Sequence, residues 1–547
     1  MNEILQQTHE MIDNLKAICT NYGLGNTGNE YKIITETFLY KFLNDKFFYE
    51  LKKNSPACKS KTTRDIEKLL SEMSDDEFDS QTLYLSAHTA VIKPNQFISY
   101  LFNRHATKDF HKLFDDTLND ISDANKDIFS VKAGTGTSVK LFEPLSNYIV
   151  QPERRDDFCA AIITKLADVN FEELFSQKYD FFAEIFEYLI KDYNKDFGKY
   201  AEYYTPKAIA RIIAKILVAG DVRNVRIYDP AAGSGTLILA LAHEIGENNC
   251  TLYTQDISQK SNEILRLNLI LNNLVHSLPN VVQDDTLLNP RHLNLQQNNI
   301  ATFDYIVSNP PFNMDFSETR DTLAGDSYRA RFFAGVPNTP NKKRDGMAIY
   351  QLFLQHIIKS MNGYGKAAVV VPTGFLTAST GIALKIRQHI INKKILRGVV
   401  SMPSNIFANT STNVSVVFLD NDEASDDKVL LVDASGLGTK QKIEGTKNQR
   451  TYLSDDEINQ IIDTFNRRQE VEDFSVLVSL DEIEQKNFSF SAGQYFKVEI
   501  EYVELSPEEF QEKMQGFQSD LRKFFDEGHQ LERDILKQLE KLTYEEN

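Results

Sequence analysis

The chain has 547 residues, more than one hydrophobic core usually organises, so two or three domains are expected. Its 41% apolar and 25% charged residues are typical of a soluble globular protein, and no apolar run approaches the ~20 residues of a membrane-spanning helix. The formal net charge of -18 excludes nucleic-acid binding by bulk charge alone, so such binding would need a local basic groove or a basic partner.

Four cysteines, Cys19, Cys58, Cys159 and Cys250, lie far apart and form no CxxC pair. They are expected to be reduced thiols, neither a disulfide framework nor a zinc site. The amphipathic start of the chain has no apolar signal core. A cytoplasmic protein is therefore expected.

The first region, residues 1–165, is predicted to be a helical N-terminal domain. Residues 31–53, "YKIITETFLYKFLNDKFFYELKK", follow a helical pattern with aromatic side chains on one face. An acidic break at 71–81 and a Gly/Thr/Ser-rich loop at 131–140 interrupt the region.

In the second region, residues 166–480, short apolar runs alternate with helical patterns. This alternation is typical of a doubly wound, largely parallel α/β sheet. The predicted strands are 225–229, 251–256, 303–309, 366–372, 397–402 and 413–420, and the helices between them are 236–245, 259–273, 347–361 and 383–393.

The third region, residues 481–547, is predicted to be a C-terminal helical docking tail. Its apolar residues follow steps of four and three, as in a coiled coil, although Gly528 and Gln538 occupy two seam positions. An intramolecular hairpin is the alternative. The stripe consists of Phe510, Met514, Phe517, Leu521, Phe524, Leu531, Ile535 and Leu542.

The stretch "YDPAAGSGTL" (228–237) ends one predicted strand and opens a helix. Gly233 and Gly235 allow a tight turn that directs helix N-terminal amides at a ligand, and Asp229 stands at the strand's carboxyl end. The dinucleotide pattern GxGxxG is incomplete because Ile238 replaces its third glycine. The carboxylate suits a cationic cofactor that carries an amino acid; an ordinary tight turn is the alternative.

Acidic residues also end the next two predicted strands. Asp256, about 20 residues beyond the glycines, is placed to bind ribose hydroxyls or to cap the following helix. Asp284 and Asp285 end the third strand. An acid there could accept a hydrogen bond from the amine of an adenine, or could belong to a surface turn.

The motif "SNPPFN" (308–313) follows the strand 303–309. Two prolines fix the backbone and remove two N–H donors, which leaves the Asn309 side chain and the Pro310 carbonyl as rigid acceptors. Together they could receive both hydrogens of one amino group, and Phe312 could stack on the base that carries it. A stiff turn is the plain alternative.

A long insertion, residues 314–346, follows this motif and is rich in basic and aromatic residues. A loop of this length is usually functional or disordered. We expect it to close over DNA, with a solvated mobile loop as the alternative. Its basic residues are Arg320, Arg329, Arg331, Lys342, Lys343 and Arg344.

The motifs "DPAAGSGT", "TQD" and "NPPF", in this order, resemble those of amino-group DNA methyltransferases that use S-adenosylmethionine. The upstream segment "AEYYTP" (201–206) resembles the one that these enzymes place beside the methionine part of the cofactor. The order of the segments is similar to the gamma arrangement of adenine-N6 enzymes. The resemblance implies a Rossmann-like class I methyltransferase domain.

The chain more closely resembles the modification (M) subunit of type I restriction-modification systems. Segments 365–376, 402–420 and 490–496 are similar to later segments of that subfamily, as are the helical N-terminal domain and the coiled tail. The resemblance implies methyl transfer to adenine N6 in double-stranded DNA.

The resemblance also implies which residues form the site. The shorter Asp256 stands where the family often has Glu, which leaves its reach to the ribose in doubt. The target base would be bound by Asn309, Pro310, Pro311 and Phe312. The cofactor would be bound by Glu202, Tyr203, Tyr204, Thr205, Pro206, Lys207, Asp229, Gly233, Ser234, Gly235, Thr236, Asp256 and Asp285, without a metal ion.

The sequence has no separate target-recognition domain after "NPPF" and no GxxxxGK[ST] phosphate loop. A separate specificity (S) subunit is therefore expected, and a restriction/translocase (R) subunit and a second copy of the chain fit the same assembly. Methylation of cytosine N4, RNA or protein glutamine remains an alternative, as does a non-catalytic assembly subunit.

Overall fold

The computed structural model describes residues 2–25, 27–129, 131–132, 138–172, 175, 188, 205–294, 299–407, 412–422, 427–442, 449–496 and 506–539. The chain divides into two units, Met1–Tyr495 and Phe496–Asn547. Among the helices of the described ranges, none is both long enough and apolar enough to span a membrane.

The N-terminal part of the first unit is helical, as predicted. The long helix α2 (Gly28–Asn54) packs against α1 (Asn2–Asn21), α8 (Arg155–Ala167) and α13 (Gln259–Leu271). The sequence predicts aromatics on one face of this helix, but buried side chains lie all around it because neighbours surround it on every side. The other helices are α3 (Thr63–Ser71), α4 (Asp75–Thr82), α5 (Ile98–Phe102), α6 (Phe110–Ala124), α7 (Lys126–Phe129) and α8 (Arg155–Ala167), and a small pair, β1 (Val131–Lys132) and β2 (Ser138–Val139), lies between α7 and α8.

A nine-stranded sheet forms the centre of the rest of the unit, in the order β15-β12-β10-β11-β9-β8-β3-β4-β5. Each strand predicted from the sequence is present. The strands are β3 (Val225–Asp229), β4 (Cys250–Asp256), β5 (Val281–Gln283), β8 (Phe303–Ser308), β9 (Met361–Pro372), β10 (Leu396–Ser401), β11 (Val414–Asp420), β12 (Lys428–Asp433) and β15 (Ser475–Ser479).

Seven of these strands run in one direction. Strands β5, β4, β3, β8 and β9 pair in parallel, β11 is antiparallel to both β9 and β10, and β12 is parallel to β10. The carboxyl ends of all except β11 and β15 therefore lie along one edge of the sheet, where open α/β sheets bind their ligands.

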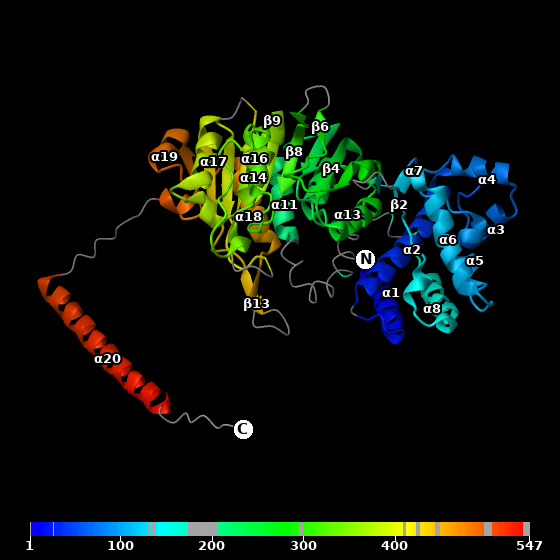
Figure 1. The fold of residues 1–547 in the computed structure, drawn as a ribbon, viewed down its shortest axis with the longest axis horizontal. Helices are drawn as coiled ribbons and strands as arrows, with labels where there is room; N and C mark the ends of the chain where they lie inside the picture. Colours follow the sequence, from blue (N-terminus) through cyan, green and yellow to red (C-terminus); the bar gives the residue numbers. More distant parts are fainter. Residues whose placement is uncertain are drawn as a thin grey trace. The chain divides into compact units, whose positions relative to one another are not determined.

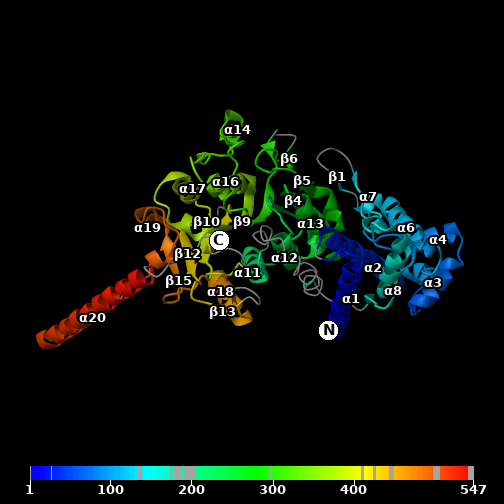
Figure 2. The same ribbon diagram turned by 60° about the horizontal axis from the view of Figure 1, so that its bottom comes forward.

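Helices cover both faces of the sheet (Figures 1 and 2). On one face α11 packs between α12 and α18, and on the other α16 contacts α17. Their apolar faces meet strands that are buried on both sides, as in other doubly wound folds. The bounds are α11 (Lys207–Leu217), α12 (Thr236–Ile245), α13 (Gln259–Leu271), α16 (Tyr350–Ser360), α17 (Gly381–Asn392), α18 (Asp455–Arg467) and α19 (Leu480–Gln485).

Residues 481–495, predicted to belong to the tail, lie in the first unit. The fully buried Arg387 of α17 explains their attachment, since its guanidinium donates to the carbonyl oxygens of Phe375, Ala378 and Phe488. A buried cation satisfied by three carbonyls ties the chain around Phe488 to the sheet region.

The second unit contains the predicted tail helix, α20 (Pro507–Leu539). The apolar stripe lies on this helix from Phe510 to Ile535, and none of its side chains is buried within the described residues. Leu542 lies outside those residues. Helical stability in proteins comes mostly from packing of an amphipathic face, and the apolar face of α20 is exposed along the described residues.

Candidate active site

The "NPPF" segment begins where β8 ends, at the carboxyl edge of the sheet. The side-chain amide of Asn309 donates from Nδ2 to the hydroxyl of Thr205, 3.2 Å away. Thr205 is buried, which fixes the amide in one orientation. Because Nδ2 faces the hydroxyl, Oδ1 points the other way as an acceptor. Phe312 is partly buried and meets the ring of Tyr350 edge-on, 6.5 Å between centroids.

Asp229, at the end of β3, joins the glycine turn to the "NPPF" segment. Its Oδ1 accepts from the backbone N–H of Ala231 at 3.0 Å and from the hydroxyl of Ser308 at 2.9 Å. Ser308 precedes Asn309 directly. The carboxyl group is buried, and burial raises its pKa from 3.8 to about 7, with a further contribution from the negative charge of Asp256.

The glycine turn takes the shape that the sequence predicts. Gly233 and Gly235 have φ angles of 53° and 87°, in the left-handed region that favours glycine. A Cβ at Gly235 would lie 2.3 Å from a methyl carbon of Leu265, so the turn also packs closely on α13. The side chain of Asn268 donates to the carbonyl of Ser234 at 2.8 Å and holds the turn from the same helix.

Asp256 organises the turn from the end of β4. One carboxylate oxygen accepts from the N–H of Gly233 and the other from the N–H of Ser258, both at 2.8 Å. Burial raises the pKa of this carboxyl. Asp256 therefore positions the backbone of the site, whether or not it also meets a ribose.

Asp285 lies one strand further, after β5. Its Oδ1 accepts from the backbone N–H groups of Leu287 and Leu288, at 2.8 and 3.1 Å, which closes a turn. Its neighbour Asp284 pairs with Arg291 outside the site. Of the two acids at this strand end, only Asp285 is found lining the cavity described next.

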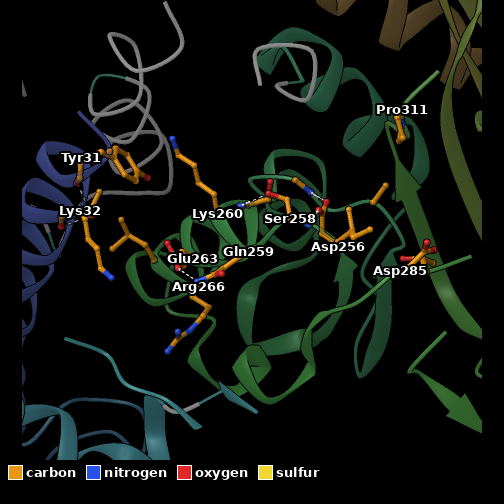
Figure 3. Close-up of a pocket in the computed structure, with 18 of the residues that line it drawn as sticks. Tyr31, Lys32, Asp256, Ser258, Gln259, Lys260, Glu263, Arg266, Asp285 and Pro311 are labelled. Atoms are coloured by element: carbon orange, nitrogen blue, oxygen red, sulfur yellow. Dashed lines mark hydrogen bonds between the residues drawn. The ribbon is translucent and has the colours of Figure 1, made fainter. Parts of the chain in front are cut away.

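A cavity of about 760 Å³ lies against these residues. Its size is that of a small-molecule site. Figure 3 shows Asp256, Ser258 and the charged side chains of α13 along one side of it, with Asp285 and Pro311 beyond them. Gly233 and Asn309 also line it, whereas Asp229 is buried behind the turn.

The far wall of the cavity comes from the N-terminal helical part. Tyr31 and Lys32 of α2 face α13 across it (Figure 3), and Glu36 and Glu143 complete this wall. Lys32 forms an ion pair with Glu143 at 2.6 Å. Burial raises the pKa of Glu36 to about 8. Nothing in the sequence indicates this contribution, because α2 lies about 200 residues before the glycine turn.

The family model described as N-6 DNA Methylase matches residues 177–502, more than half of the chain. The chain belongs to the N-6 DNA methylase family. The family resemblance inferred from the motifs is thereby confirmed, and so is an activity toward the N6 amine of adenine in DNA.

Type I methylase subunits are among the methylase's relatives. It is 26% identical over 492 residues to the methylase subunit of the type I restriction enzyme MpnII from Mycoplasma pneumoniae, a match that covers 87% of this chain and 85% of the relative. It is 27% identical over 454 residues to the HindI methylase subunit from Haemophilus influenzae, covering 79% and 93%.

A solved structure confirms the predicted fold. The methyltransferase subunit of a type I restriction-modification system from Streptococcus thermophilus superposes with a TM-score of 0.71 at 19% identity, covering 90% of this chain and all of that one. At this identity the likeness concerns the fold alone: a mixed α/β sheet with a helical N-terminal region.

The insertion 314–346 of the methylase differs from the expected loop. It contains α14 (Arg320–Leu323) and α15 (Asp326–Arg329) and packs its own apolar cluster around Phe316 and Phe332. The prediction of DNA contact is wrong for Arg331, which is 8% exposed and donates to the carbonyls of Thr286 and Leu287. Its guanidinium joins the insertion to the loop after β5.

Arg320 makes hydrogen bonds within the insertion, since it donates to the carbonyl of Pro337 and to the side chain of Asn338. Arg329 and the three basic residues at 342–344 are exposed, and their contact with DNA stays a prediction.

The expected cofactor residues Glu202, Tyr203 and Tyr204 lie outside the described residues. Lys207 begins α11 and Pro206 caps it, directly after Thr205, and Thr236 begins α12 with its hydroxyl 3.1 Å from that of Ser234.

Sequence reasoning missed Ser308, Asn268 and the wall from α2. Ser308 could have been suspected, since it ends a buried strand directly before Asn309. Asn268 lies on a buried helix face where a polar residue is unusual, which is a weak signal.

The titration of Asp229 gives a pH prediction. The carboxyl group of Asp229 binds a proton more tightly in the folded methylase than in the unfolded chain. The contribution of this proton to the free energy of unfolding is therefore complete below about pH 4 and is lost as the pH rises to about 7. Asp229→Asn keeps the Oδ1 acceptor but cannot ionise. The thermal unfolding midpoint of the variant relative to wild type should therefore rise between about pH 5 and about pH 8.

This comparison uses the difference between the two proteins because Glu36 and Asp256, whose pKa values are also raised, titrate in both. Unfolding followed by circular dichroism at several pH values measures the difference. A difference that stays constant with pH would contradict an ionisable, buried Asp229.

Proposed function

We propose that the methylase acts as the modification subunit of a type I restriction-modification complex and transfers the methyl group of S-adenosylmethionine to adenine N6 in DNA. The hydrogen bond between Asn309 and the buried Thr205 carries the assignment of the site. It orients the amide so that Oδ1, next to the rigid Pro310 carbonyl, is left to accept from a substrate amine.

In this proposal the side chain of Asn309 and the carbonyl of Pro310 accept the two N6 hydrogens of an adenine extruded from the duplex. Extrusion costs a few kcal/mol for unstacking, and contact with Phe312 offsets part of it. Held in this way, the amine keeps its lone pair directed outward. The chain's own residues thus contribute by position and electrostatics.

The cavity residues fit S-adenosylmethionine, which supplies, when bound, a methyl group on a sulfonium that is already a good leaving group. The cavity of about 760 Å³ has carboxylates at Asp256 and Asp285 for hydroxyl and amine donors. The buried Asp229 behind the turn, with its pKa near 7, favours a cationic ligand, because a nearby positive charge stabilises its ionised form.

Two features of the rest of the chain support binding to a separate specificity subunit. The net charge of -18 leaves little bulk attraction to DNA, and the second unit carries an exposed apolar stripe on α20. The stripe includes Phe517, Leu521 and Phe524, each more than half exposed. A coiled-coil partner would bury it. A restriction subunit and a second copy of the chain complete the proposed assembly.

The function is tested with labelled S-adenosylmethionine. Host-unmodified DNA is incubated with the methylase alone and with the specificity subunit co-expressed from the neighbouring gene. We expect label in DNA only when both chains are present. Label on RNA or on protein, or none with either preparation, would contradict the proposal.

A further inference from the structure

A basic β-hairpin projects from the first unit. It consists of β13 (Thr439–Lys442) and β14 (Gln449–Tyr452), and we name these two strands the basic hairpin. Three cations, Lys440, Lys442 and Arg450, lie on them, with no acidic residue on either strand. Residues 443–448, outside the described part, hold one Glu and one Lys and leave this balance unchanged.

The cations lie on both faces of the hairpin. All four residues of β13 are exposed, so Lys440 and Lys442 point to solvent from one face. Arg450 pairs in register with Gln441 on the other face, and its guanidinium lies 5.2 Å from the ring centre of Tyr452. Within the described ranges, none of the three cations has an ion-pair partner.

The base of the hairpin is firmly attached. Thr451 donates from its N–H to the carbonyl of Asn405 at 2.9 Å and from its hydroxyl to the carbonyl of Ser404 at 2.6 Å. The N–H of Gly438 donates to Glu457 of α18 at 2.7 Å. Gly438 has a φ of 88°, and a Cβ there would lie 2.5 Å from a methyl carbon of Thr451. The cations are therefore held by a rigid support.

The basic hairpin lies at the same edge of the sheet as Asn309. It follows β12, whose carboxyl end faces that edge, and it is bound to the loop after β10, which ends there too. Figure 1 shows β13 on the opposite side of the sheet from β6 (Leu293–Asn294), which precedes β8 at the amino edge. Four strand spacings separate β12 from β8, roughly 19 Å at about 4.8 Å per strand.

This distance fits a duplex whose adenine has entered the site. It corresponds to five or six base pairs at about 3.4 Å each, roughly half a helical turn from the extruded base. The major groove of B-DNA, about 12 Å wide, admits a two-stranded β-ribbon. The basic hairpin also supplies local positive charge for the DNA phosphates, which a chain of net charge -18 otherwise lacks.

We infer that the basic hairpin binds the phosphates of the DNA duplex about half a turn from the target adenine, independently of sequence. The inference rests on the proposed function, because it requires the duplex to lie along the carboxyl edge. Lys440, Lys442 and Arg450 act as phosphate ligands, and the sequence is read elsewhere. The basic hairpin thus gives the methylase a DNA contact of its own, in addition to the contacts that the specificity subunit makes.

The test compares the wild-type complex with one that carries the triple variant K440Q/K442Q/R450Q. Binding to a duplex that the wild-type complex methylates, and to an unrelated duplex, is measured by fluorescence anisotropy over a range of salt concentrations. We expect the slope of log K against log salt to become shallower by about 2–3, and equally for both duplexes, because three phosphate contacts are lost. The affinity for S-adenosylmethionine should not change.

K61Q/R64Q/K68Q is the matched control, since it also removes two lysines and one arginine, all exposed, from the region around α3. Its salt slope should equal that of the wild type. An unchanged slope in the hairpin variant, or the same change in the control, would overturn the inference while wild-type methylation still upholds the function. Loss of complex assembly on size-exclusion chromatography would also overturn it, because the hairpin would then bind the partner protein.

Discussion

Replacement of Asn309 by alanine should reduce methyl transfer by at least about 10²–10³-fold, the cost of removing one preorganised hydrogen-bonding group from a reacting centre. Asn309 accepts from the substrate amine in the proposed complex, and Thr205 holds it for that task. The affinity for S-adenosylmethionine should stay within about threefold of the wild-type value, because no cofactor contact is assigned to this side chain. A threefold change corresponds to less than about 1.4 kcal/mol, the free energy of a tenfold change. Single-turnover kinetics and equilibrium dialysis measure the two quantities.

Asn313→Ala is the matched control, four residues further along the same segment and exposed. It should methylate DNA at the wild-type rate. Two variants at Thr205 provide a second control. Thr205→Val removes the hydroxyl that orients Asn309 and should lower the rate of methyl transfer about tenfold. Thr205→Ser keeps a hydroxyl and should retain the wild-type rate. Equal loss of methyl transfer and cofactor binding in Asn309→Ala would contradict the assigned role.

Replacement of Asp256 by alanine should weaken binding of S-adenosylmethionine by at least about 100-fold. The change removes the acceptor for the N–H groups of Gly233 and Ser258, and each hydrogen bond to a charged group contributes about 1.5–3 kcal/mol. Without them the glycine turn loses the shape that faces the ligand. Isothermal titration calorimetry measures the affinity, and thermal unfolding measures the loss of stability.

Asp304→Ala separates these two effects. Asp304 also accepts two hydrogen bonds, from the N–H of Arg226 and the side chain of Asn362, but it lies at the amino edge of the sheet. It should lose a similar amount of stability and keep wild-type cofactor affinity. A 100-fold loss of affinity in both variants would show that Asp256 acts only through folding.

The sheet could be predicted because its strands are buried on both faces and therefore appear as short apolar runs between helices. β3 begins and ends at the predicted residues, and β8 differs by one. β12 and β15 extend the sheet beyond the predicted strands. β15 is only partly buried and gives a weaker pattern, whereas β12 is buried and its apolar run is a strand that the prediction lacks. The tail boundary was wrong because the attachment of residues 481–495 depends on Arg387, more than ninety positions away.

The proximity of the candidate site residues could be predicted because strand ends on neighbouring parallel strands meet at one edge. Asp229, Asp256 and Asn309 were each identified from such an end, and the structure brings them together. The wall from α2 could not be predicted, because it depends on how two regions pack. Arg331 was misjudged for a related reason: its position in a charged insertion indicates a surface, but its side chain lies beneath it.

The central claim is tested most directly by identifying the modified base. DNA is isolated from a methylation-deficient host that expresses the methylase with its specificity subunit, digested to nucleosides and analysed by mass spectrometry. We expect N6-methyladenine with the wild-type chain and none with Asn309→Ala. N4-methylcytosine, or N6-methyladenine that persists in Asn309→Ala, would contradict it.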